Sequence, residues 1–434
     1  MEQGHREMLS VTRERAILAA VLLPGHQADP HDPLNELRSL ADTADAIVVD
    51  EMLQQRPKPD GTTFIGKGKV VELAERVKAT RADVVVFDND LSPSQIANIE
   101  EVVGCKILDR SELILDIFAG RAKTHEARLQ VELAQLQYTY PRLRAMWSHL
   151  ERIVGGSPMG IGTRGPGEQQ LEIDRRIVQR KISVLRSEIK VVQGRKEREV
   201  AARNLDFFTV GLVGYTNAGK STLFNTLTAG QAYADDKLFA TLSTRTRKWE
   251  LGDGDSVMLS DTVGFIRDLP HHLVASFRAT LEEAVHSDLL LILLDVAHPR
   301  CRQQHETVLQ VLDEIGANTQ PRILVLNKID KLDNNADLLV LQREHLEAVA
   351  ISARTGRGLE VLVELVRTAA RGGMKELTLS LPLSAGKAIN FLENRATVLD
   401  RQYHDDLVHL TLRIGQRQLD QFKAMGAQFE VVTV

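Results

Sequence analysis

The chain has 434 residues, too many for one hydrophobic core of ordinary size, and this length predicts two to four domains. Its composition, 43% hydrophobic and 26% charged, is typical of folded globular proteins and excludes a disordered or collagen-like chain, while two cysteines exclude a disulfide framework. The formal net charge is −5, yet residues 121–204 carry 17 Lys and Arg against 9 Asp and Glu, so this segment is basic and the rest is acidic.

The first 120 residues alternate short apolar runs with amphipathic segments. The pattern predicts strands at 16–23, 46–49, 84–87 and 106–108 and helices at 69–78 and 93–103. This alternation indicates an α/β domain with a partly parallel sheet. The run at 16–23 is far shorter than the roughly 20 residues that cross a bilayer, and it fits a buried strand better than a signal peptide. We therefore expect a cytoplasmic protein with no membrane span, either free or peripheral at a membrane surface.

Two segments of the basic stretch repeat apolar residues every three or four positions, as one face of a helix does. In the first segment these residues are Leu129, Leu133, Leu136, Tyr140, Leu143, Trp147 and Leu150. In the second they are Leu171, Val178, Ile182, Leu185, Ile189 and Val192. One apolar stripe on each helix predicts an antiparallel helical hairpin. Pro141 removes a backbone donor and crowds the preceding turn, so it should kink or divide the first helix near Tyr140.

Basic side chains fall largely on the predicted outer face of the second helix: Arg175, Arg176, Arg180, Lys181, Arg186 and Lys190. Any solvated hairpin shows such a face, but the net positive charge favours an anionic partner such as RNA. Residues 155–167, between the helices, hold glycines and prolines that suit neither helix nor strand. Because Met159, Ile161 and Arg164 stand among them, we favour a loop that orders on a partner over a plain linker.

The clearest chemical pattern is GYTNAGKS, from Gly214 to Ser221, which satisfies GxxxxGK[ST]. A short apolar strand at 209–213 precedes it, and a helix-forming segment at 221–227 follows. In such a loop the glycines let the backbone approach a phosphate, and N–H groups at the start of the helix surround that phosphate. Lys220 would contact the β- and γ-phosphates, and the Ser221 hydroxyl would bind Mg²⁺.

The next pattern, DTVG from Asp261 to Gly264, follows a strand-like segment at 257–259. A carboxylate at the end of a strand beside the phosphate loop can hold the magnesium ion through water. The glycine N–H can contact the γ-phosphate. The pattern is common by itself, and its value comes from its position about 40 residues beyond the phosphate loop.

Two later patterns predict the base. NKID, from Asn327 to Asp330, follows the strand-like segment 323–326. The Asp330 carboxylate can accept hydrogen bonds from the guanine N1–H and 2-amino group, whereas adenine has neither donor there. Lys328 would cover the base plane, and SAR at 352–354 would direct a backbone N–H to the guanine oxygen. The elements together favour GTP over ATP.

The last 60 or so residues predict the order βαββαβ. The strands are expected at 377–381, 396–399, 408–414 and 429–434, and the helices at 387–392 and 419–425. This order indicates a ferredoxin-like module, which says nothing of function by itself. We therefore divide the chain into an N-terminal α/β domain (1–120), a basic helical hairpin (121–204), a P-loop domain (205–371) and a C-terminal α+β domain (372–434).

The nucleotide patterns resemble the TRAFAC class of GTPases, and longer strings resemble the HflX family of ribosome-associated GTPases in its Obg-HflX-like group. These strings are FIGKGK at 64–69, DNDLSPSQ at 88–95, ILDIFA at 114–119 and GIGTRGPGE at 160–168. The resemblance extends to about Arg371. It implies that the glycine-rich loop reaches the peptidyl-transferase region of the large ribosomal subunit, and it makes Arg164 an RNA contact, together with Arg175 and Arg176 on the basic face.

The patterns and the resemblance together predict the site residues. Nucleotide contacts are expected from Gly214, Tyr215, Thr216, Asn217, Ala218, Gly219, Lys220, Ser221, Thr222, Phe239, Ala240, Thr241, Leu242, Ser243, Asp261, Thr262, Val263, Gly264, Asn327, Lys328, Ile329, Asp330, Ser352, Ala353 and Arg354. Catalytic roles fall to Lys220, Thr241 and Gly264, and the Mg²⁺ ligands are Ser221 and Thr241. The family's FATLDPTTR reads FATLSTRTR here, at 239–247, so Thr244 is an alternative to Thr241 as the metal ligand. The family's GETQLE reads GEQQLE, a mild change at Gln169.

Two residues bear on the mechanism of hydrolysis. Many small GTPases orient the attacking water with a glutamine directly after DxxG, where this chain has Phe265. An apolar ring cannot polarise water, so we expect slow intrinsic hydrolysis that a partner accelerates. Asn217 lies where potassium-dependent GTPases often carry asparagine, which would add K⁺ to Mg²⁺ as a cofactor. A plain turn-stabilising asparagine is an equally good interpretation.

Three functions compete at this point. The first is a monomeric, GTP-switched factor that binds the RNA and proteins of the large ribosomal subunit, opposes subunit association as a splitting or rescue factor, and leaves after hydrolysis to GDP. The second is a regulatory GTPase coupled to RNA modification or remodelling. The sequence of the N-terminal domain shows no set of residues suited to acid–base or metal chemistry, which argues against this function. The third is a protein-binding switch at a membrane, for which no lipidation signal or amphipathic anchor is present.

Overall fold

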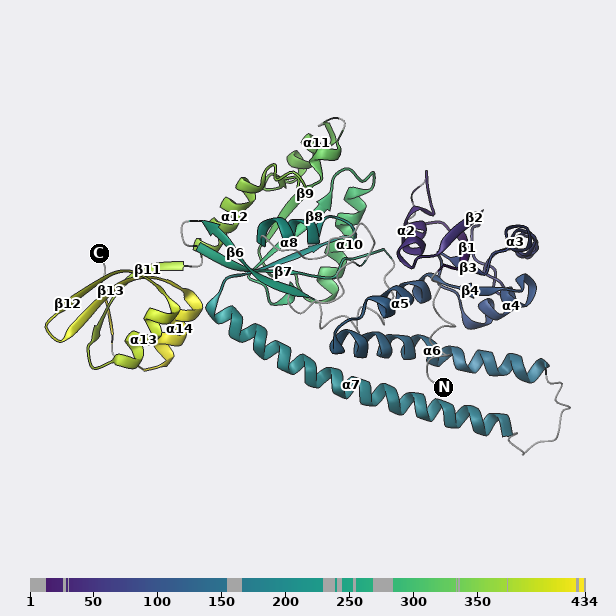
Figure 1. Cartoon of the computed structure of the whole chain (residues 1–434), viewed down its shortest axis with the longest axis horizontal. Coiled ribbons are helices and arrows are strands. Elements are labelled where there is room, and N and C mark those ends of the chain that lie inside the picture. The colour runs from purple at the N-terminus through teal and green to yellow at the C-terminus, as the bar shows by residue number, and fades with distance from the viewer. Residues whose placement is uncertain are drawn as a thin grey trace.

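The computed structural model describes residues 13–25, 29, 31–153, 166–228, 239, 244–252, 255–267, 284–332, 334, 336–372, 374–426 and 429–432. Three separate sheets follow one another along the molecule, and a long helical hairpin runs along one side of the first two (Figure 1). No helix in these ranges is both long enough and apolar enough to cross a membrane.

The first sheet, with its helices, forms what we call the N-terminal unit. Its strands are β1 (Arg15–Leu22), β2 (Ile47–Gln55), β3 (Val84–Phe87) and β4 (Lys106–Leu108), and its helices are α2 (Asn35–Thr43), α3 (Lys67–Thr80), α4 (Pro93–Val103) and α5 (Arg110–Arg121). The described strands pair in parallel in the order β2-β1-β3-β4. Alternate residues of β1 face opposite sides of the sheet, so Ala16 and Leu18 pack with α2 and α5, whereas Ile17 and Ala19 pack with α3 and α4. The sequence predicted these four strands, α3 and α4, but it missed α2 and α5.

Local signals explain the bounds of α4. The Ser92 side chain accepts a hydrogen bond from the backbone N–H of Gln95, the Gln95 side-chain oxygen accepts one from the backbone N–H of Ser92, and Pro93 occupies the first turn. The helix ends at Gly104, which adopts φ +75°.

The hairpin consists of α6 (His125–Ile153) and α7 (Pro166–Asp206). Leu129 and Leu133 of α6 pack against Leu185 and Ile189 of α7, as the apolar stripes predict. The opposite face of α6, including Val131, is also buried, against the N-terminal unit. The expectation of one apolar stripe on α6 is therefore wrong, because this helix lies between two partners.

Pro141 was expected to kink or divide the first helix; division is wrong, since α6 continues through it, and a kink stays a prediction. Side chains on either side of the proline anchor the helix to the N-terminal unit. Tyr138 donates a hydrogen bond to Asp109 at 2.7 Å, and Arg142 donates to Asp109 at 2.6 Å and to the Leu91 carbonyl at 3.0 Å. These contacts stabilise the helical turn in which the proline lacks a donor.

The second sheet, with its helices, forms what we call the G unit. Its strands are β5 (Thr209–Gly214), β6 (Arg245–Gly252), β7 (Asp255–Asp261), β8 (Leu289–Asp295), β9 (Arg322–Asn327) and β10 (Val349–Ala350); its helices are α8 (Lys220–Thr228), α10 (Cys301–Glu314), α11 (Ala336–Glu344), α12 (Leu359–Gly372) and the short 3-10 helix η1 (Ile329–Lys331). The order is β10-β9-β8-β5-β7-β6, and only β6 is antiparallel to its described neighbour. The carboxyl ends of β5, β7, β9 and β10 therefore lie at one edge, where ligands bind in open parallel sheets.

The third sheet contains β11 (Met374–Pro382), β12 (Thr397–His404), β13 (Leu407–Gly415) and β14 (Glu430–Val432), with α13 (Gly386–Arg395) and α14 (Gln416–Ala424). Its order is β12-β13-β11-β14, and the described pairings are antiparallel. The elements follow the βαββαβ order of a ferredoxin-like module. The domain boundaries at residues 120, 204 and 371 stay a prediction.

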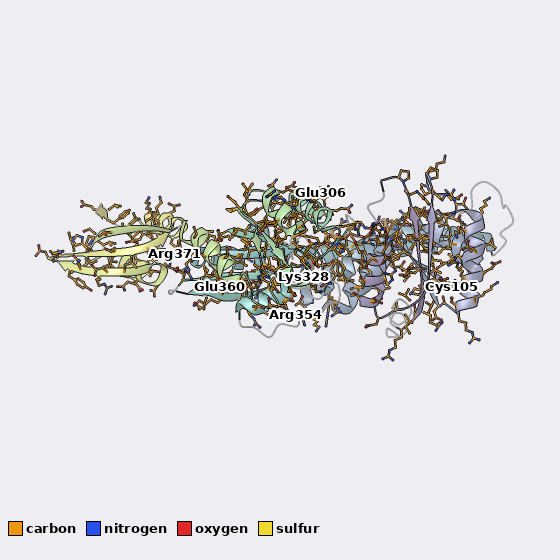
Figure 2. All side chains as sticks on the ribbon, turned by 90° about the horizontal axis from the view of Figure 1, so that it is seen from above. Cys105, Glu306, Lys328, Arg354, Glu360 and Arg371 are labelled. Atoms are coloured by element: carbon orange, nitrogen blue, oxygen red, sulfur yellow. The ribbon has the colours of Figure 1, made fainter. Side chains whose placement is uncertain are left out.

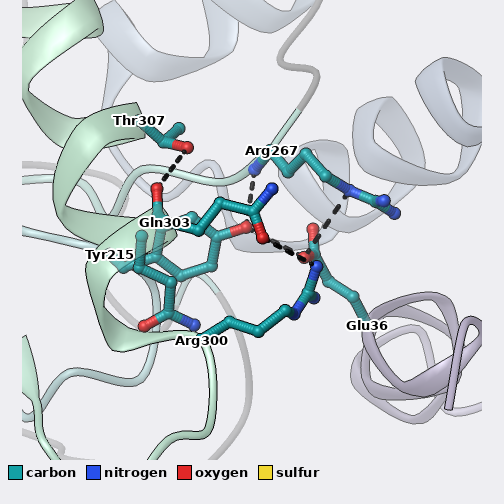
Figure 3. Close-up of a pocket in the computed structure, with 7 residues that line it drawn as sticks. Glu36, Tyr215, Arg267, Arg300, Gln303 and Thr307 are labelled. Carbon is teal, nitrogen blue, oxygen red and sulfur yellow. Dashed lines mark hydrogen bonds and ion pairs between the residues drawn. The ribbon is translucent and has the colours of Figure 1, made fainter. Parts of the chain in front are cut away.

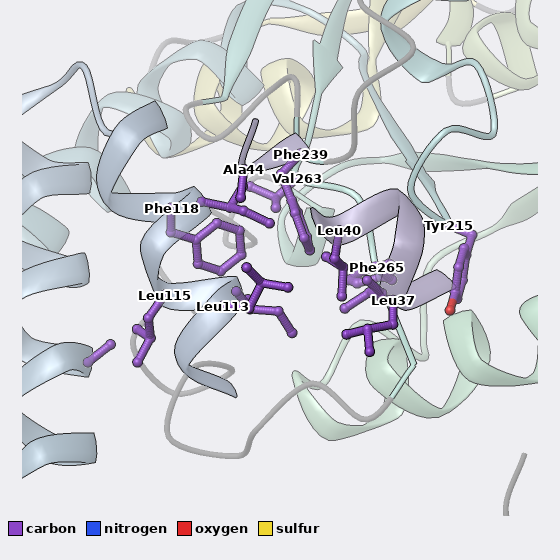
Figure 4. Packing of buried hydrophobic residues seen from close by; sticks show 14 of the residues in the cluster. Leu37, Leu40, Ala44, Leu113, Leu115, Phe118, Tyr215, Phe239, Val263 and Phe265 are labelled. Carbon is purple, nitrogen blue, oxygen red and sulfur yellow. The ribbon is translucent and has the colours of Figure 1, made fainter. Parts of the chain in front are cut away.

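The N-terminal unit and the G unit share one continuous apolar core. Leu37 and Leu40 of α2 and Phe118 of α5 lie against Val263 and Phe265 of the G unit (Figure 4). Phe265 is 2% exposed, so the ring that replaces the glutamine of many small GTPases is buried between the two units.

Candidate nucleotide site

The predicted phosphate loop joins β5 to α8, and its lysine is held in place from within the loop. Lys220 begins α8 and is buried, and its Nζ donates to the carbonyl oxygens of Gly214 at 3.0 Å and Tyr215 at 2.7 Å. Burial lowers the pKa of Lys220 to about 8, although the carboxylate of Asp261 opposes this shift. A phosphate placed beside this ammonium group would relieve the cost of burying it.

Close packing around the loop leaves no room for side chains at two glycines. Gly219 has φ +96°, and a Cβ there would collide with the Asn327 amide nitrogen. A Cβ on Gly264 of the DTVG pattern would lie 2.8 Å from Thr216 Cγ2 and 2.9 Å from Lys220 Nζ. The glycine of DTVG thus lies directly beside the lysine of the phosphate loop.

A hydroxyl and a carboxylate meet where the metal ion is predicted. Ser221 Oγ donates to Asp261 Oδ2 at 2.8 Å, because β7 pairs with β5 and brings Asp261 level with Leu212. Asp261 is 1% exposed. Hydroxyl and carboxylate oxygens are the ligand types that Mg²⁺ prefers, so this donor set fits the ion.

Thr241 and Thr244 of the FATLSTRTR segment are the two candidates for a further Mg²⁺ ligand. Thr241 lies outside the described residues, as do Ala240, Leu242 and Ser243. Thr244 is described, and its Oγ1 lies 3.5 Å from the Nζ of Lys196 on α7. A hydroxyl beside an ammonium group is a poor ligand for a second cation.

Asn327 connects the phosphate loop with the segment at 352–354. Its side-chain amide donates to the Ala218 carbonyl at 2.8 Å and accepts from the backbone N–H of Ala353 at 3.0 Å. Asn327 is buried, and Ser352 is too. The NKID and SAR patterns, 22 residues apart in the sequence from Asp330 to Ser352, therefore join at one edge of the sheet.

Lys328 is oriented by a carboxylate that the sequence analysis missed. Its Nζ lies 2.6 Å from Oδ2 of Asp295, the last residue of β8, whose strand partner is Asn327. Asp330 and Arg354 have exposed side chains, as an open base pocket requires, and Figure 2 shows Lys328 and Arg354 on the G unit. The sequence did contain a signal for Asp295, because this aspartate ends an apolar run, β8, that pairs with the strand leading into NKID.

The remaining predicted residues fall into three groups. Thr222 and Ile329 lie in α8 and η1 beside the site, and Thr262 Oγ1 donates to the Leu212 carbonyl at 2.7 Å. Phe239 and Val263 are buried at the contact with the N-terminal unit. On the hairpin, Arg175 and Arg176 are exposed, whereas Arg164 lies outside the described residues.

Comparison with known proteins identifies the chain. The model of a GTP-binding GTPase N-terminal region matches residues 31–119, that of a GTP-binding GTPase middle region matches 121–203, and that of a 50S ribosome-binding GTPase matches 209–328. The GTPase HflX of Escherichia coli K12 is 43% identical over 404 residues, which cover 92% of this chain and 93% of that protein. This chain belongs to the HflX family of GTPases.

Other HflX proteins agree. The GTPase HflX of Lacrimispora saccharolytica is 42% identical over 401 residues, with 92% of this chain and 93% of that protein covered. Among solved structures, the complex of SsGBP with GDP is 24% identical, covers 82% of this chain and 98% of its own, and has a TM-score of 0.48. As an HflX GTPase, the chain has a P-loop GTPase fold and hydrolyses GTP to GDP and phosphate.

Proposed function

We propose that this HflX GTPase binds the large ribosomal subunit under the control of its nucleotide, opposes subunit association in a splitting or rescue role, and leaves after hydrolysis. The observation that carries this proposal is the basic surface of α7. Arg175, Arg176 and Arg180 have exposed side chains on α7, and two residues separate the end of this helix from β5, the strand that leads into the phosphate loop. Such a surface suits the phosphates of RNA. The description of the family model for 209–328 as a 50S ribosome-binding GTPase supports the choice of subunit.

The roles of the site residues follow from their chemistry. Lys220 binds the β- and γ-phosphates, and Asp330 and Lys328 bind the guanine base, held in register by Asn327. Ser221 and Thr241 would hold Mg²⁺, with Asp261 acting through water, and the ion when bound would neutralise charge that develops on the phosphates. Gly264 lies beside Lys220, so its N–H would contact the γ-phosphate.

Intrinsic hydrolysis is slow in this proposal because the residue directly after DTVG is Phe265, whose apolar ring cannot polarise the attacking water. The Phe265 side chain is buried in the apolar core that α2 shares with the G unit. The ribosome would accelerate the reaction by reshaping the segments on either side of the nucleotide. We place the protein, as a monomer, in the cytoplasm with its ribosomal partner.

A monovalent cation is a further part of this proposal. Asn217 adopts φ +60° in the phosphate loop, a conformation that asparagine tolerates better than most residues. Its amide oxygen would help to hold K⁺ beside the phosphates. Hydrolysis rates in KCl and NaCl at equal ionic strength test this: equal rates contradict it, and a faster rate in KCl that Asn217→Ala abolishes supports it.

Co-sedimentation with purified ribosomal subunits tests the central proposal. We expect binding to the large subunit with a non-hydrolysable GTP analogue and weaker binding with GDP. Removing residues 155–167, or the double change Arg175→Glu and Arg176→Glu, should weaken binding, whereas Arg302→Glu should not. Arg302 is a matched control because it is exposed on α10 of the G unit. Binding that is indifferent to nucleotide and to these changes would contradict the proposal, and an altered RNA product would favour the RNA-modification alternative.

A further inference from the structure

A buried group of charged side chains joins the N-terminal unit to the G unit. We call it the interface node, and its members are Glu36, Asp88, Arg110, Tyr215 and Arg267. Arg110 Nη1 lies 2.5 Å from Asp88 Oδ1, and Arg267 Nη2 lies 2.8 Å from the other oxygen of Asp88. Arg110 also pairs with Glu36. Arg110, Asp88 and Arg267 are all less than 5% exposed, so their charges interact with little screening by solvent.

Tyr215 is the member of the node that belongs to the phosphate loop. Its hydroxyl donates to Glu36 Oε2 at 2.9 Å and accepts from the backbone N–H of Arg267 at 2.7 Å (Figure 3). The carbonyl of Arg267 in turn accepts from Arg110 Nη2 at 3.1 Å. Both backbone polar groups of Arg267 are therefore held by side chains, one from the phosphate loop and one from the N-terminal unit.

The residues just before Arg267 are fastened to the phosphate loop by their backbones. The Phe265 N–H donates to the Gly214 carbonyl at 3.1 Å, and the Thr216 N–H donates to the Phe265 carbonyl at 2.7 Å. Gly264 comes directly before these anchors and lies beside Lys220. The position of the Gly264 N–H relative to the γ-phosphate thus depends on how firmly 265–267 are held.

We propose that Tyr215, acting with Glu36, is a positioning residue for GTP hydrolysis. Its hydroxyl fixes the backbone of Arg267, which orders 264–267 before GTP arrives. A segment that is already ordered loses less conformational freedom on the way to the transition state. We expect the effect in the step in which the γ-phosphate is transferred, because the Tyr215 hydroxyl bonds to Glu36 and Arg267, whereas Asn327 bonds to Ala218 and Ala353.

The alternative is that the node only holds the two units together. A structural contact of that kind would affect stability and would leave the balance between catalysis and nucleotide binding unchanged. The chain offers a matched control in Tyr138, a second buried phenol that donates to a carboxylate of the N-terminal unit, Asp109, at 2.7 Å but lies away from the phosphate loop.

The test compares Tyr215→Phe with Tyr138→Phe in the full chain without ribosomes, so its outcome is independent of the proposed ribosomal function. For Tyr215→Phe we expect kcat for GTP to fall about tenfold, the rate equivalent of one buried hydrogen bond, while the Kd for GDP stays within about twofold. For Tyr138→Phe we expect a lower Tm and an unchanged kcat. An unchanged or raised kcat in Tyr215→Phe, or an equal fall in Tyr138→Phe, would overturn the proposal.

Glu36 provides an independent measurement. Glu36→Ala removes the acceptor of the Tyr215 hydroxyl, whereas Glu36→Gln keeps an oxygen there and should restore part of kcat. If both residues act through one contact, adding Tyr215→Phe to Glu36→Ala should change kcat by less than about twofold. Fully additive losses would show that the two residues act separately and would contradict the shared role.

Discussion

The ring of Phe118 meets the ring of Phe239 edge to face, with centroids 4.6 Å apart and planes inclined by 77°. Phe118 belongs to α5 of the N-terminal unit, and Phe239 begins the FATLSTRTR segment of the G unit. Both rings are buried. One aromatic pair therefore ties the N-terminal unit to the segment that carries the proposed metal ligand Thr241.

Replacing Phe118 should loosen this contact. Phe118→Leu loses the edge-to-face interaction and leaves a small cavity, so we expect a loss of about 1–2 kcal/mol in the free energy of unfolding. Urea denaturation followed by circular dichroism measures it. Val361→Ala, on the exposed face of α12, serves as a control and should leave the midpoint unchanged. A denaturation midpoint for Phe118→Leu equal to that of the wild type would contradict the packing described here.

Introducing the glutamine of other GTPases at position 265 should not accelerate hydrolysis. The Phe265 side chain points into the apolar core against α2, so Phe265→Gln buries an amide there and costs about 2 kcal/mol or more of stability. Phe265→Leu keeps the position apolar and should retain most of the stability. Single-turnover GTP hydrolysis and Tm together check this prediction, and a Phe265→Gln protein that is faster than the wild type would refute it.

Asn327→Ala should abolish tight nucleotide binding. The substitution removes the two hydrogen bonds that hold Ala218 and Ala353 together, and it leaves a buried carbonyl and a buried N–H without these partners. We expect the Kd for GDP to rise about 100-fold, measured by fluorescence titration. Asn334→Ala is the control, since Asn334 is exposed and caps only the N–H of Ala336. Equal Kd values for the two variants would count against the role given to Asn327.

Glu112 predicts a pH dependence of stability. Burial, together with the nearby carboxylate of Asp109, raises the pKa of Glu112 from its ordinary value of 4.5 to about 7. The folded protein binds this proton more tightly than the unfolded chain does, so its contribution is fully present below about pH 4.5 and is lost as the pH rises to about 7. Glu112→Gln cannot lose a proton, so its Tm relative to that of the wild type should rise between pH 5 and pH 8. A parallel pair of Tm profiles would contradict the prediction, and Glu347→Gln, at an exposed position, is the control.

The parts of the site that could be predicted from the sequence are those whose residues are contiguous. The phosphate loop, DTVG and NKID each place their chemistry within eight residues or fewer, and each follows a strand that its apolar run reveals. The position of Asp261 beside Ser221 then follows from parallel pairing alone. In such patterns the same few residues indicate both the local structure and the chemical role.

The interface node could not be predicted in this way. Arg110 is 2% exposed only because Glu36 and Asp88, from distant parts of the chain, compensate its charge. The helix that it begins, α5, is buried on several sides, so its apolar residues show no single stripe. Pro141 was misjudged for a related reason, since the contacts that keep α6 continuous come from Asp109 and Leu91. Burial that depends on residues far away in the sequence leaves no periodic signal.

The length of α7 has a mechanical consequence. A helix of 41 residues is about 60 Å long, so a rotation of only about 5° at one end moves the other end by about 5 Å. The end near Asp206 feeds directly into β5, and Lys196 near that end reaches Thr244. A partner that pushes on the end of α7 next to the glycine-rich residues would therefore act on two parts of the G unit together. These are β5, which leads into the phosphate loop, and Thr244, which Lys196 contacts. In the other direction, a small rotation of α7 when the γ-phosphate is lost would displace the far end of the helix enough to break contacts made there.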